Sequence, residues 1–189
     1  MSITLNGNGT ITGYTPVPDG SITSAKLASG VGGKILQVQS VVKQSGFSAS
    51  ASAGSFSDIT GLSVAITMTN ASNKVLINFQ SSISMGSDVN QRGSFRLLRG
   101  STVINAASAD GQNTEQAIFP SLSIQQTSQC TPVAGCFLDT PGTGTHTYKL
   151  QVGAEGGAGT VFVNAAGSGN TGLTHYKGAS SIILMEVAV

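Results

Sequence analysis

Two histidines are the side chains of this sequence best suited to general acid–base catalysis near neutral pH. His146 lies in the segment GTHTYK and His175 in LTHYKG, each beside a predicted strand. A histidine needs a nucleophile, a metal or an orienting carboxylate before it can do chemistry. The sequence contains no HExxH, no GxSxG and no His–Cys cluster at ligand spacing, which favours two strand-edge histidines. No catalytic residue, no metal site and no cofactor is predicted.

Glycoside hydrolysis is a second chemistry to consider, because it needs two carboxyl groups that face each other across a groove. Most acidic residues stand in turn-like segments such as FSDIT, GSDVN, ASADG and FLDTPG, where aspartate hydrogen-bonds to its own backbone. Glu186 differs because it interrupts the apolar run LMEVAV, and we expect it to face solvent near an edge or to pair with Arg96 or Arg99. The carboxylates considered are Asp58, Asp88, Asp110, Glu115, Asp139, Glu155 and Glu186.

Cys130 and Cys136 enclose the short segment TPVAG. Their separation allows a disulfide across a small loop, and it equally allows two free thiols. A zinc site would need two more ligands, and none lies nearby in the sequence. Whether the two cysteines are bonded stays open at this point.

The composition restricts the possible partners. Only 9% of the 189 residues are charged, against roughly 25% in an average soluble domain, and the net charge is +1. The nine Lys and Arg residues are scattered, so nucleic acid is not an expected partner. No apolar stretch approaches the ~20 residues of a membrane span, and the segment MSITLNGNGT lacks the features of a signal peptide, so neither secretion by this route nor membrane insertion is expected. A chain this poor in charge and in aromatic residues (5%) is expected to gain stability by oligomerisation.

The first 33 residues differ from the rest of the chain. Two short β-runs, Ile3 to Leu5 and Thr10 to Thr12, flank Asn-Gly-Asn-Gly, which is a strong hairpin signal. The segment PVPDGSITSAKLASGVGG that follows indicates a linker with one short helix, starting at Ser21 or Thr23 and ending at Leu27. A helix this short must dock against something to be ordered. Residues 1–33 are therefore interpreted as an attachment segment.

From residue 34 onward the sequence alternates in the way of β-strands. Val75, Ile77 and Phe79 fall on one face of their strand, and Tyr148, Leu150 and Val152 do the same in theirs. About ten short strands separated by Gly, Ser, Asn and Asp predict an all-β fold, a jelly-roll-like antiparallel β-sandwich over residues 34–189. The predicted strands are KILQVQSVVK, SFSDITGLSVAITM with a break near Gly61, KVLINFQSSISM, SFRLLRG, STVINA, AIFPSLSIQQ, VAGCFLD, HTYKLQVGA, TVFVNA and SIILMEVAV.

Two of these strands are apolar on both faces. Ile182 to Met185 form an unbroken apolar run, and Ile35 stands directly beside Leu36. Such strands need cover on their second face, which is supplied by a loop of the same chain or by a neighbouring subunit. In the second interpretation the subunit interface contains Ile35, Leu36, Ile183 and Met185.

Several phrases, in this order, resemble tail-fibre-like virion proteins of bacteriophages of aquatic bacteria, including cyanophages. They are MSITLNGNGTITG, PDGSITSAKLASG, GGKILQVQSVV, FSDITGLSVAIT, SNKVLINFQSSIS, FRLLRGSTVI, FLDTPGTGTHTYKLQV, TVFVNAAG and ASSIILMEV. The resemblance implies a non-enzymatic structural protein of the virion, assembled in the host cytoplasm, often as a homotrimer, with a β-rich body and an attaching N-terminus. Attachment to other virion proteins would then use Ile3, Leu5, Ile11, Ile22 and Leu27. A host cell-surface glycan or protein is the expected external partner, and assembly in a reducing compartment favours free thiols.

The resemblance leaves the place on the particle open. The chain has no repeat and no heptads, so a long fibre is not expected, and a short tail fibre, a neck or baseplate appendage and a capsid decoration, cement or head-fibre protein remain. The polar segments 85–93 and 109–116 suit glycan contacts and ordinary surface loops equally well. A polysaccharide depolymerase is the third and weakest alternative.

Overall fold

The structure is a computed structural model in which the described residues are mainly strands. It describes residues 4–5, 11–12, 34–52, 54–86, 91–104, 119–124, 130–155, 159–166 and 177–189. For residues 4–5, 11–12, 91, 119–124 and 155 the description covers the backbone alone. The chain divides into two units, Met1–Lys34 and Ile35–Val189, which are described separately.

Every regular element in the described part of the chain is a β-strand, which confirms the all-β prediction. The strands are β1 (Thr4–Leu5), β2 (Ile11–Thr12), β3 (Ile35–Lys43), β4 (Phe47–Ala51), β5 (Phe56–Met68), β6 (Lys74–Met85), β7 (Gln91–Arg99), β8 (Thr102–Ile104), β9 (Phe119–Ile124), β10 (Thr131–Asp139), β11 (Gly144–Glu155), β12 (Gly159–Val163) and β13 (Ser180–Val187).

In the first unit, β1 and β2 pair as an antiparallel hairpin, with Leu5 opposite Ile11. This agrees with the hairpin predicted from Asn-Gly-Asn-Gly. The predicted helix from Ser21 or Thr23 to Leu27 lies outside the described residues. Within the described part of the chain, no helix has the length and apolarity that a membrane crossing requires.

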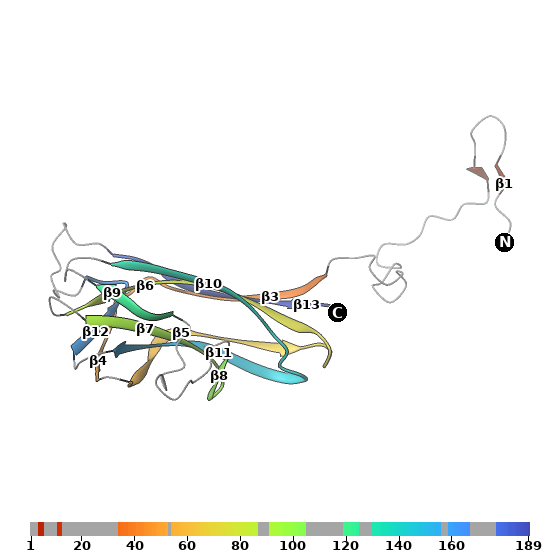
Figure 1. Ribbon diagram of the computed structural model, residues 1–189. Helices are drawn as coiled ribbons and strands as arrows, with labels where there is room; N and C mark the ends of the chain where they lie inside the picture. The colour runs from red at the N-terminus through yellow and green to blue at the C-terminus, as the bar shows by residue number, and fades with distance from the viewer. Residues whose placement is uncertain are drawn as a thin grey trace. The chain divides into compact units, whose positions relative to one another are not determined.

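The second unit is a sandwich of two antiparallel sheets (Figure 1). The six-stranded sheet has the order β3-β13-β6-β12-β4, and β10 pairs with the other edge of β6. β13 pairs with β6 over residues 74–80 and β12 pairs with β6 over residues 83–85, so β13 and β12 follow one another along one side of β6. β3 and β4 continue this arrangement one strand further out, because they pair with β13 and β12 respectively.

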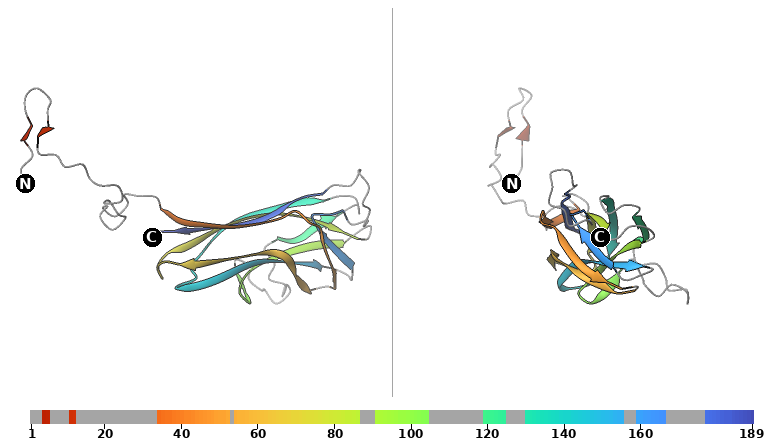
Figure 2. Two further views of the ribbon diagram at one scale, coloured as in Figure 1. Left: turned by 180° about the vertical axis from the view of Figure 1, so that it is seen from behind. Right: turned by 90° about the vertical axis from the view of Figure 1, so that its left-hand side faces the viewer.

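The five-stranded sheet has the order β5-β11-β7-β8, with β9 also paired to β7. The predicted break near Gly61 is an irregularity in the pairing of β5 with β11. Lys149 pairs with Ser63 and Gln151 pairs with Asp58, so two positions along β11 correspond to five positions along β5. Gly61 has φ 81°, which glycine adopts without strain. The extra β5 residues let Ile59 and Leu62 both point into the core although they are three positions apart. Figure 2 shows the two layers from behind.

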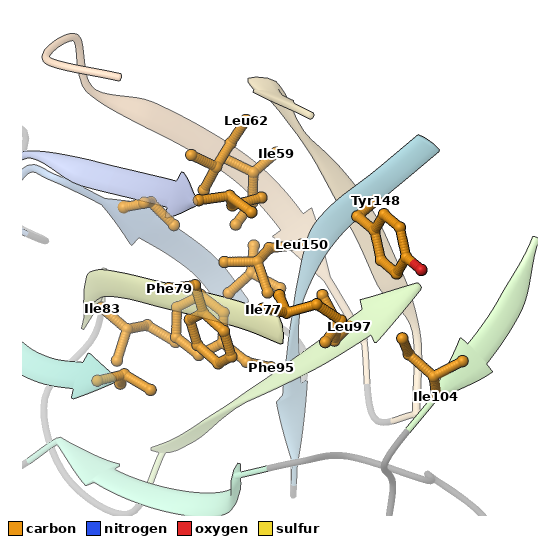
Figure 3. Close-up of a cluster of buried hydrophobic side chains, with 14 of the residues drawn as sticks. Ile59, Leu62, Ile77, Phe79, Ile83, Phe95, Leu97, Ile104, Tyr148 and Leu150 are labelled. Atoms are coloured by element: carbon orange, nitrogen blue, oxygen red, sulfur yellow. The ribbon is translucent and has the colours of Figure 1, made fainter. Parts of the chain in front are cut away.

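The core lies between the two sheets, where alternate residues of both point inward (Figure 3). The six-stranded sheet contributes Val75, Ile77 and Phe79, as the alternation in β6 predicts. Tyr148 and Leu150 come from β11 of the opposite sheet. The remaining buried members are Ala51, Ile59, Leu62, Ile66, Met68, Ile83, Met85, Phe95, Leu97, Ile104, Val133, Val152, Ala154, Val161, Val163, Ile182 and Leu184.

β4 is missing from the predicted strands. Its sequence, FSASA, alternates between partly or fully buried and exposed residues, but serine and alanine have low strand propensity. Pairing with β12, together with burial of Ala51, places it in the sheet. Pairing and packing in the folded chain therefore make this segment a strand, although its own residues have little strand propensity.

Candidate interaction surface

Of the two histidines considered for catalysis, the structure describes His146. His146 lies on β11, and its Nε2 is 3.0 Å from the backbone oxygen of Thr143, consistent with a strand-edge residue. His175 lies outside the described residues. Within the described residues, no group of three His, Cys, Asp or Glu side chains is placed to hold a metal ion.

Asp58 and Asp139 were predicted to act as turn residues, and the structure corrects both. Asp58 lies within β5 and accepts hydrogen bonds from Lys149 Nζ at 2.7 Å and Gln151 Nε2 at 2.8 Å on β11. These bonds, above all the one from Lys149, lower the pKa of Asp58. The prediction of a turn at the segment FSDIT was wrong because the irregular pairing of β5 with β11 keeps this segment in the sheet.

Asp139, the last residue of β10, joins the two sheets. Its Oδ2 accepts hydrogen bonds from Arg99 Nη1 at 2.6 Å and from the Tyr148 hydroxyl at 2.7 Å, and both donors belong to the five-stranded sheet. Burial of the phenol, together with this hydrogen bond, raises the pKa of Tyr148. Arg99, one of the two arginines suggested for Glu186, is therefore paired with another carboxylate.

Glu186 is fully buried, which corrects the expectation of a solvent-facing or arginine-paired residue. Its Oε1 accepts hydrogen bonds from the Thr69 amide at 2.8 Å, the Thr69 hydroxyl at 2.7 Å and Asn73 Nδ2 at 2.7 Å. Its Oε2 accepts one from Gln37 Nε2 at 2.6 Å. Burial by itself raises a carboxyl pKa, but these neutral donors outweigh it and lower the pKa of Glu186 to about 2. Arg96 lies elsewhere, with its guanidinium 3.7 Å from the centroid of the Phe56 ring.

The described carboxylates thus serve different parts of the sandwich. Asp58 lies on the outer side of the five-stranded sheet, Asp139 bridges the sheets, and Glu186 is buried beside the turn before β6. The backbone of Glu155 is in β11, and Asp88, Asp110 and Glu115 lie outside the described residues. No pair among Asp58, Asp139 and Glu186 faces across one groove.

Neither cysteine forms a disulfide, and the Cys130 thiol donates a hydrogen bond to the backbone oxygen of Ala165 at 3.4 Å. The spacing allowed a disulfide across a small loop, but residues Thr131–Asp139 form the strand β10, which contains the predicted strand VAGCFLD. Six residues of extended chain, at ~3.3 Å each, separate the two cysteines by about 20 Å. A disulfide needs Cα atoms within about 7 Å, so this strand keeps the thiols apart.

The outer face of the six-stranded sheet, here called the open face, is the surface that departs from ordinary sandwich patterning. It is built by the outward residues of β3, β13, β6 and β10, which pair directly across the sheet. Residues directly opposite in antiparallel strands share one face, so the pairing defines continuous rows. The apolar row contains Val38, Met185, Leu76 and Leu138; the middle row contains Ser40, Ile183, Asn78 and Cys136; the small-residue row contains Val42, Ser181, Gln80 and Ala134.

Large apolar side chains at the margins of this face are exposed to solvent. Val38 is 54% exposed, Leu138 51% and Val42 61%. A further row of Ile35, Val187 and Lys74 lies beside the apolar row, and Lys74 is the single charged residue of the four rows. In a lone chain, the open face would therefore leave apolar strands uncovered.

The predicted interface residues all come from strands of this face. Ile35 faces outward opposite Val187, and Leu36 is the extra residue of a bulge in β3, since Gln37 pairs with Glu186 and Ile35 with Val187. Ile183 and Met185 lie on the outward side of β13 and are half-buried. The expectation that these strands are covered on both faces does not hold within one chain, because Ile35 and Leu36 are exposed.

Sequence reasoning missed Val38, Leu76 and Leu138 as members of the same surface. Each strand alone shows an apolar residue of unknown orientation, and only the register places Leu76 between Met185 and Leu138. The signal in the sequence is the run of adjacent apolar residues such as Val41-Val42.

The outer face of the five-stranded sheet provides a contrast. It carries the ion pair between Lys149 and Asp58, and the hydroxyls of Thr67 and Thr145 are hydrogen-bonded at 2.8 Å. Polar and charged side chains of this kind are typical of a solvated sheet face. The two outer faces of one sandwich therefore differ in chemistry.

The attachment residues predicted in the first 33 positions cannot be placed as side chains. The backbone of Leu5 pairs with that of Ile11 in the β1–β2 hairpin. Ile3, Ile22 and Leu27 lie outside the described residues.

Comparisons with protein-family profiles and with curated protein sequences find no match to this chain. Among solved structures, the chain is similar to one from the structure of the infectious bursal disease virus Gx strain, with 12% sequence identity and a TM-score of 0.39. The similarity covers 82% of this chain and 37% of the viral chain, so the chain spans less than half the length of that structure.

Proposed function

We propose that this protein is a non-enzymatic structural subunit of a bacteriophage virion, a short tail fibre or appendage. Residues 1–33 attach it to the particle, and the sandwich is presented for adhesion to a host-surface glycan or protein. The observation that carries the structural role is the open face, a nearly uncharged sheet surface with exposed Val38, Val42 and Leu138. A surface of this kind is suited to lasting association with another macromolecule.

The sequence resemblance supports the assignment to a virion. It runs through the chain in one order, from MSITLNGNGTITG to ASSIILMEV. The proposal includes the homotrimer that this family implies, and the mass of the purified protein tests it: a trimer would weigh three times 19.0 kDa. A capsid decoration, cement or head-fibre protein would use the same open face against a shell.

Localisation on intact particles tests the role and separates the two candidates. A labelled antibody against the sandwich is expected to mark the tail or another discrete appendage. A uniform signal over the capsid shell would instead favour the decoration protein. Absence of the protein from purified virions would contradict both.

Deletion of residues 1–33 tests the attachment segment. The shortened chain is expected to remain folded but to be missing from particles when it replaces the full-length protein. Circular dichroism of the purified variant serves as the folding control. Normal incorporation of the shortened chain would overturn the assignment of attachment to this segment.

A further inference from the structure

The two halves of the open face differ in their side chains. One half is the apolar row of Val38, Met185, Leu76 and Leu138. The other half contains a shallow groove of about 490 Å³ along β10, β6 and β13, which also reaches the middle row at Asn78, Cys136 and Ile183. Its lining includes Ala134, Gly135 and Ser181, whose small side chains leave the space. A second groove of about 500 Å³ shares Gln80 and Ala134 with it and extends to Gly178 and Ala179.

The two halves match each other in size and spacing. Leu76 of the apolar row and Gln80 of the small-residue row are four residues apart on β6, about 13 Å at ~3.3 Å per residue. The middle row, with Asn78 and Cys136, lies halfway between them. Turning a copy of the face about an axis along the middle row would place Leu138 against Ala134, and Met185 against Ser181. At these two positions a large side chain of one copy would meet a small one of the other, while Leu76 would meet Gln80 and Val38 would meet Val42.

We propose that the apolar row of one copy of this chain packs into the groove of another copy. Both a ring of two and a ring of three copies, closed about an axis parallel to the rows, bring these halves together. This inference rests on the homo-oligomer that forms part of the proposed function and adds which surfaces of the copies pack together. It can be tested on the purified protein without a virion.

Charge and hydrogen bonding identify a second copy as the occupant. Lys74 is the one charged residue of the rows, so the face offers almost no charge for an acidic or basic partner and none that would strongly repel its own copy. The polar groups that remain, Asn78, Gln80, Ser40 and Ser181, are amides and hydroxyls that both donate and accept hydrogen bonds. Such groups can pair with an identical set.

The area of the face is sufficient for a specific contact. Four strands at ~4.8 Å and the seven positions from Lys74 to Gln80 at ~3.3 Å give roughly 440 Å² for each copy. Two such faces together bury roughly 900 Å², close to the 1,000 Å² expected of a biological interface.

A charge placed in the apolar row provides the first test, in the full-length protein. Leu138→Asp introduces a carboxylate at a half-exposed position, where folding tolerates it. Thr147→Asp places the same charge at an exposed position on β11 of the opposite sheet and serves as the matched control. By light scattering, the wild type and Thr147→Asp are expected to form the same oligomer. The Leu138→Asp oligomer is expected to be weaker, so that it dissociates already at protein concentrations at least 10-fold above those at which the wild type dissociates. A monomeric wild type, or a Leu138→Asp protein that associates normally, would overturn the proposal.

Cross-linking provides the second test and does not depend on a disruptive variant. In chains carrying Cys130→Ser and Cys136→Ser, Leu138→Cys is introduced into a tagged copy and Ala134→Cys into an untagged copy, and the two are co-expressed. A short thiol cross-linker is expected to join tagged to untagged chains. Predominant joining of tagged chains to one another would show row-to-row contact and contradict the packing. A failed cross-link in an oligomeric wild type overturns this packing alone, whereas a monomeric wild type overturns the homotrimer as well. The role in the virion is tested separately by localisation.

Discussion

At the scale of single residues, Glu186 shows how a charge is held inside a protein with few charges. It lies on β13, and its carboxylate is held by Gln37 of β3 and by Thr69 and Asn73 of the turn between β5 and β6. All four hydrogen bonds come from neutral groups, and each oxygen accepts at least one. The residue therefore fastens this turn to two strands of the six-stranded sheet.

Replacing Glu186 by glutamine is expected to destabilise the fold by about 1–3 kcal/mol, because the amide brings a donor to a site where every neighbour donates. Urea unfolding of the purified protein measures this change. Asp58→Asn is the control, since it removes a carboxylate from an exposed ion pair and should cost less than about 1 kcal/mol. A Glu186→Gln protein as stable as the control would contradict the role of the hydrogen bonds.

The same residue predicts a pH dependence. The pKa of Glu186 is lowered from 4.5 to about 2 in the folded chain, so its ionised form stabilises the fold at pH values above 4.5. This contribution is lost as the pH falls from 4.5 towards 2. Stability measured across this window is expected to fall more steeply for the wild type than for Glu186→Gln. Parallel curves for the two proteins would show that Glu186 does not titrate in this way.

At the scale of elements, glycine in β10 permits close packing of two aromatic rings. The rings of Phe79 on β6 and Phe137 on β10 are stacked, with centroids 6.0 Å apart and an angle of 14° between planes. A Cβ atom at Gly135 would lie 2.6 Å from Phe137 and 2.7 Å from Phe79. With the two rings in these positions, only glycine fits at this point of β10.

Gly135→Ala is expected to cost about 1–3 kcal/mol, because one or both rings must leave their positions. Thermal or urea unfolding checks the value. Gly46→Ala is the comparison, since a Cβ there would meet Ala165 Cβ at 3.4 Å, an ordinary contact. Equal stabilities of the two variants would mean that the rings move without cost.

At the scale of the whole molecule, the described residues of the hydrophobic core all belong to the second unit. The residues of the core cluster all lie between Ala51 and Leu184. The ties between the sheets, such as Arg99 to Asp139, belong to the same part of the chain. The described core residues and ties between the sheets therefore lie within the unit Ile35–Val189.

A chain lacking residues 1–33 is accordingly expected to unfold cooperatively, with a free energy of unfolding within about 1 kcal/mol of the full-length value. Urea unfolding at matched concentrations measures both proteins, and light scattering shows whether they have the same oligomeric state. A large loss of stability at equal oligomeric state would show that the first unit contributes to the folded body.

The sequence by itself determined the strands of the sandwich and the inward side of several of them. Alternation in β6 and β11 indicated that Val75, Ile77 and Tyr148 point to the core, because side-chain direction in a strand has a period of two and is a local property. The strand β4 escaped prediction because Ser and Ala give a weak local signal.

Only the tertiary structure decided which strands are neighbours and in which register. The apolar row, the hydrogen bonds around Glu186 and the bridge from Asp139 to Arg99 each join segments that are distant in the sequence. A residue 117 positions away from Glu186 supplies two of its four hydrogen bonds. Local patterns carry no information on such pairs, since sheet topology and register arise from the packing of the whole core. For that reason the sequence indicated apolar runs on β3 and β13, and only the paired strands showed which of their residues share the open face.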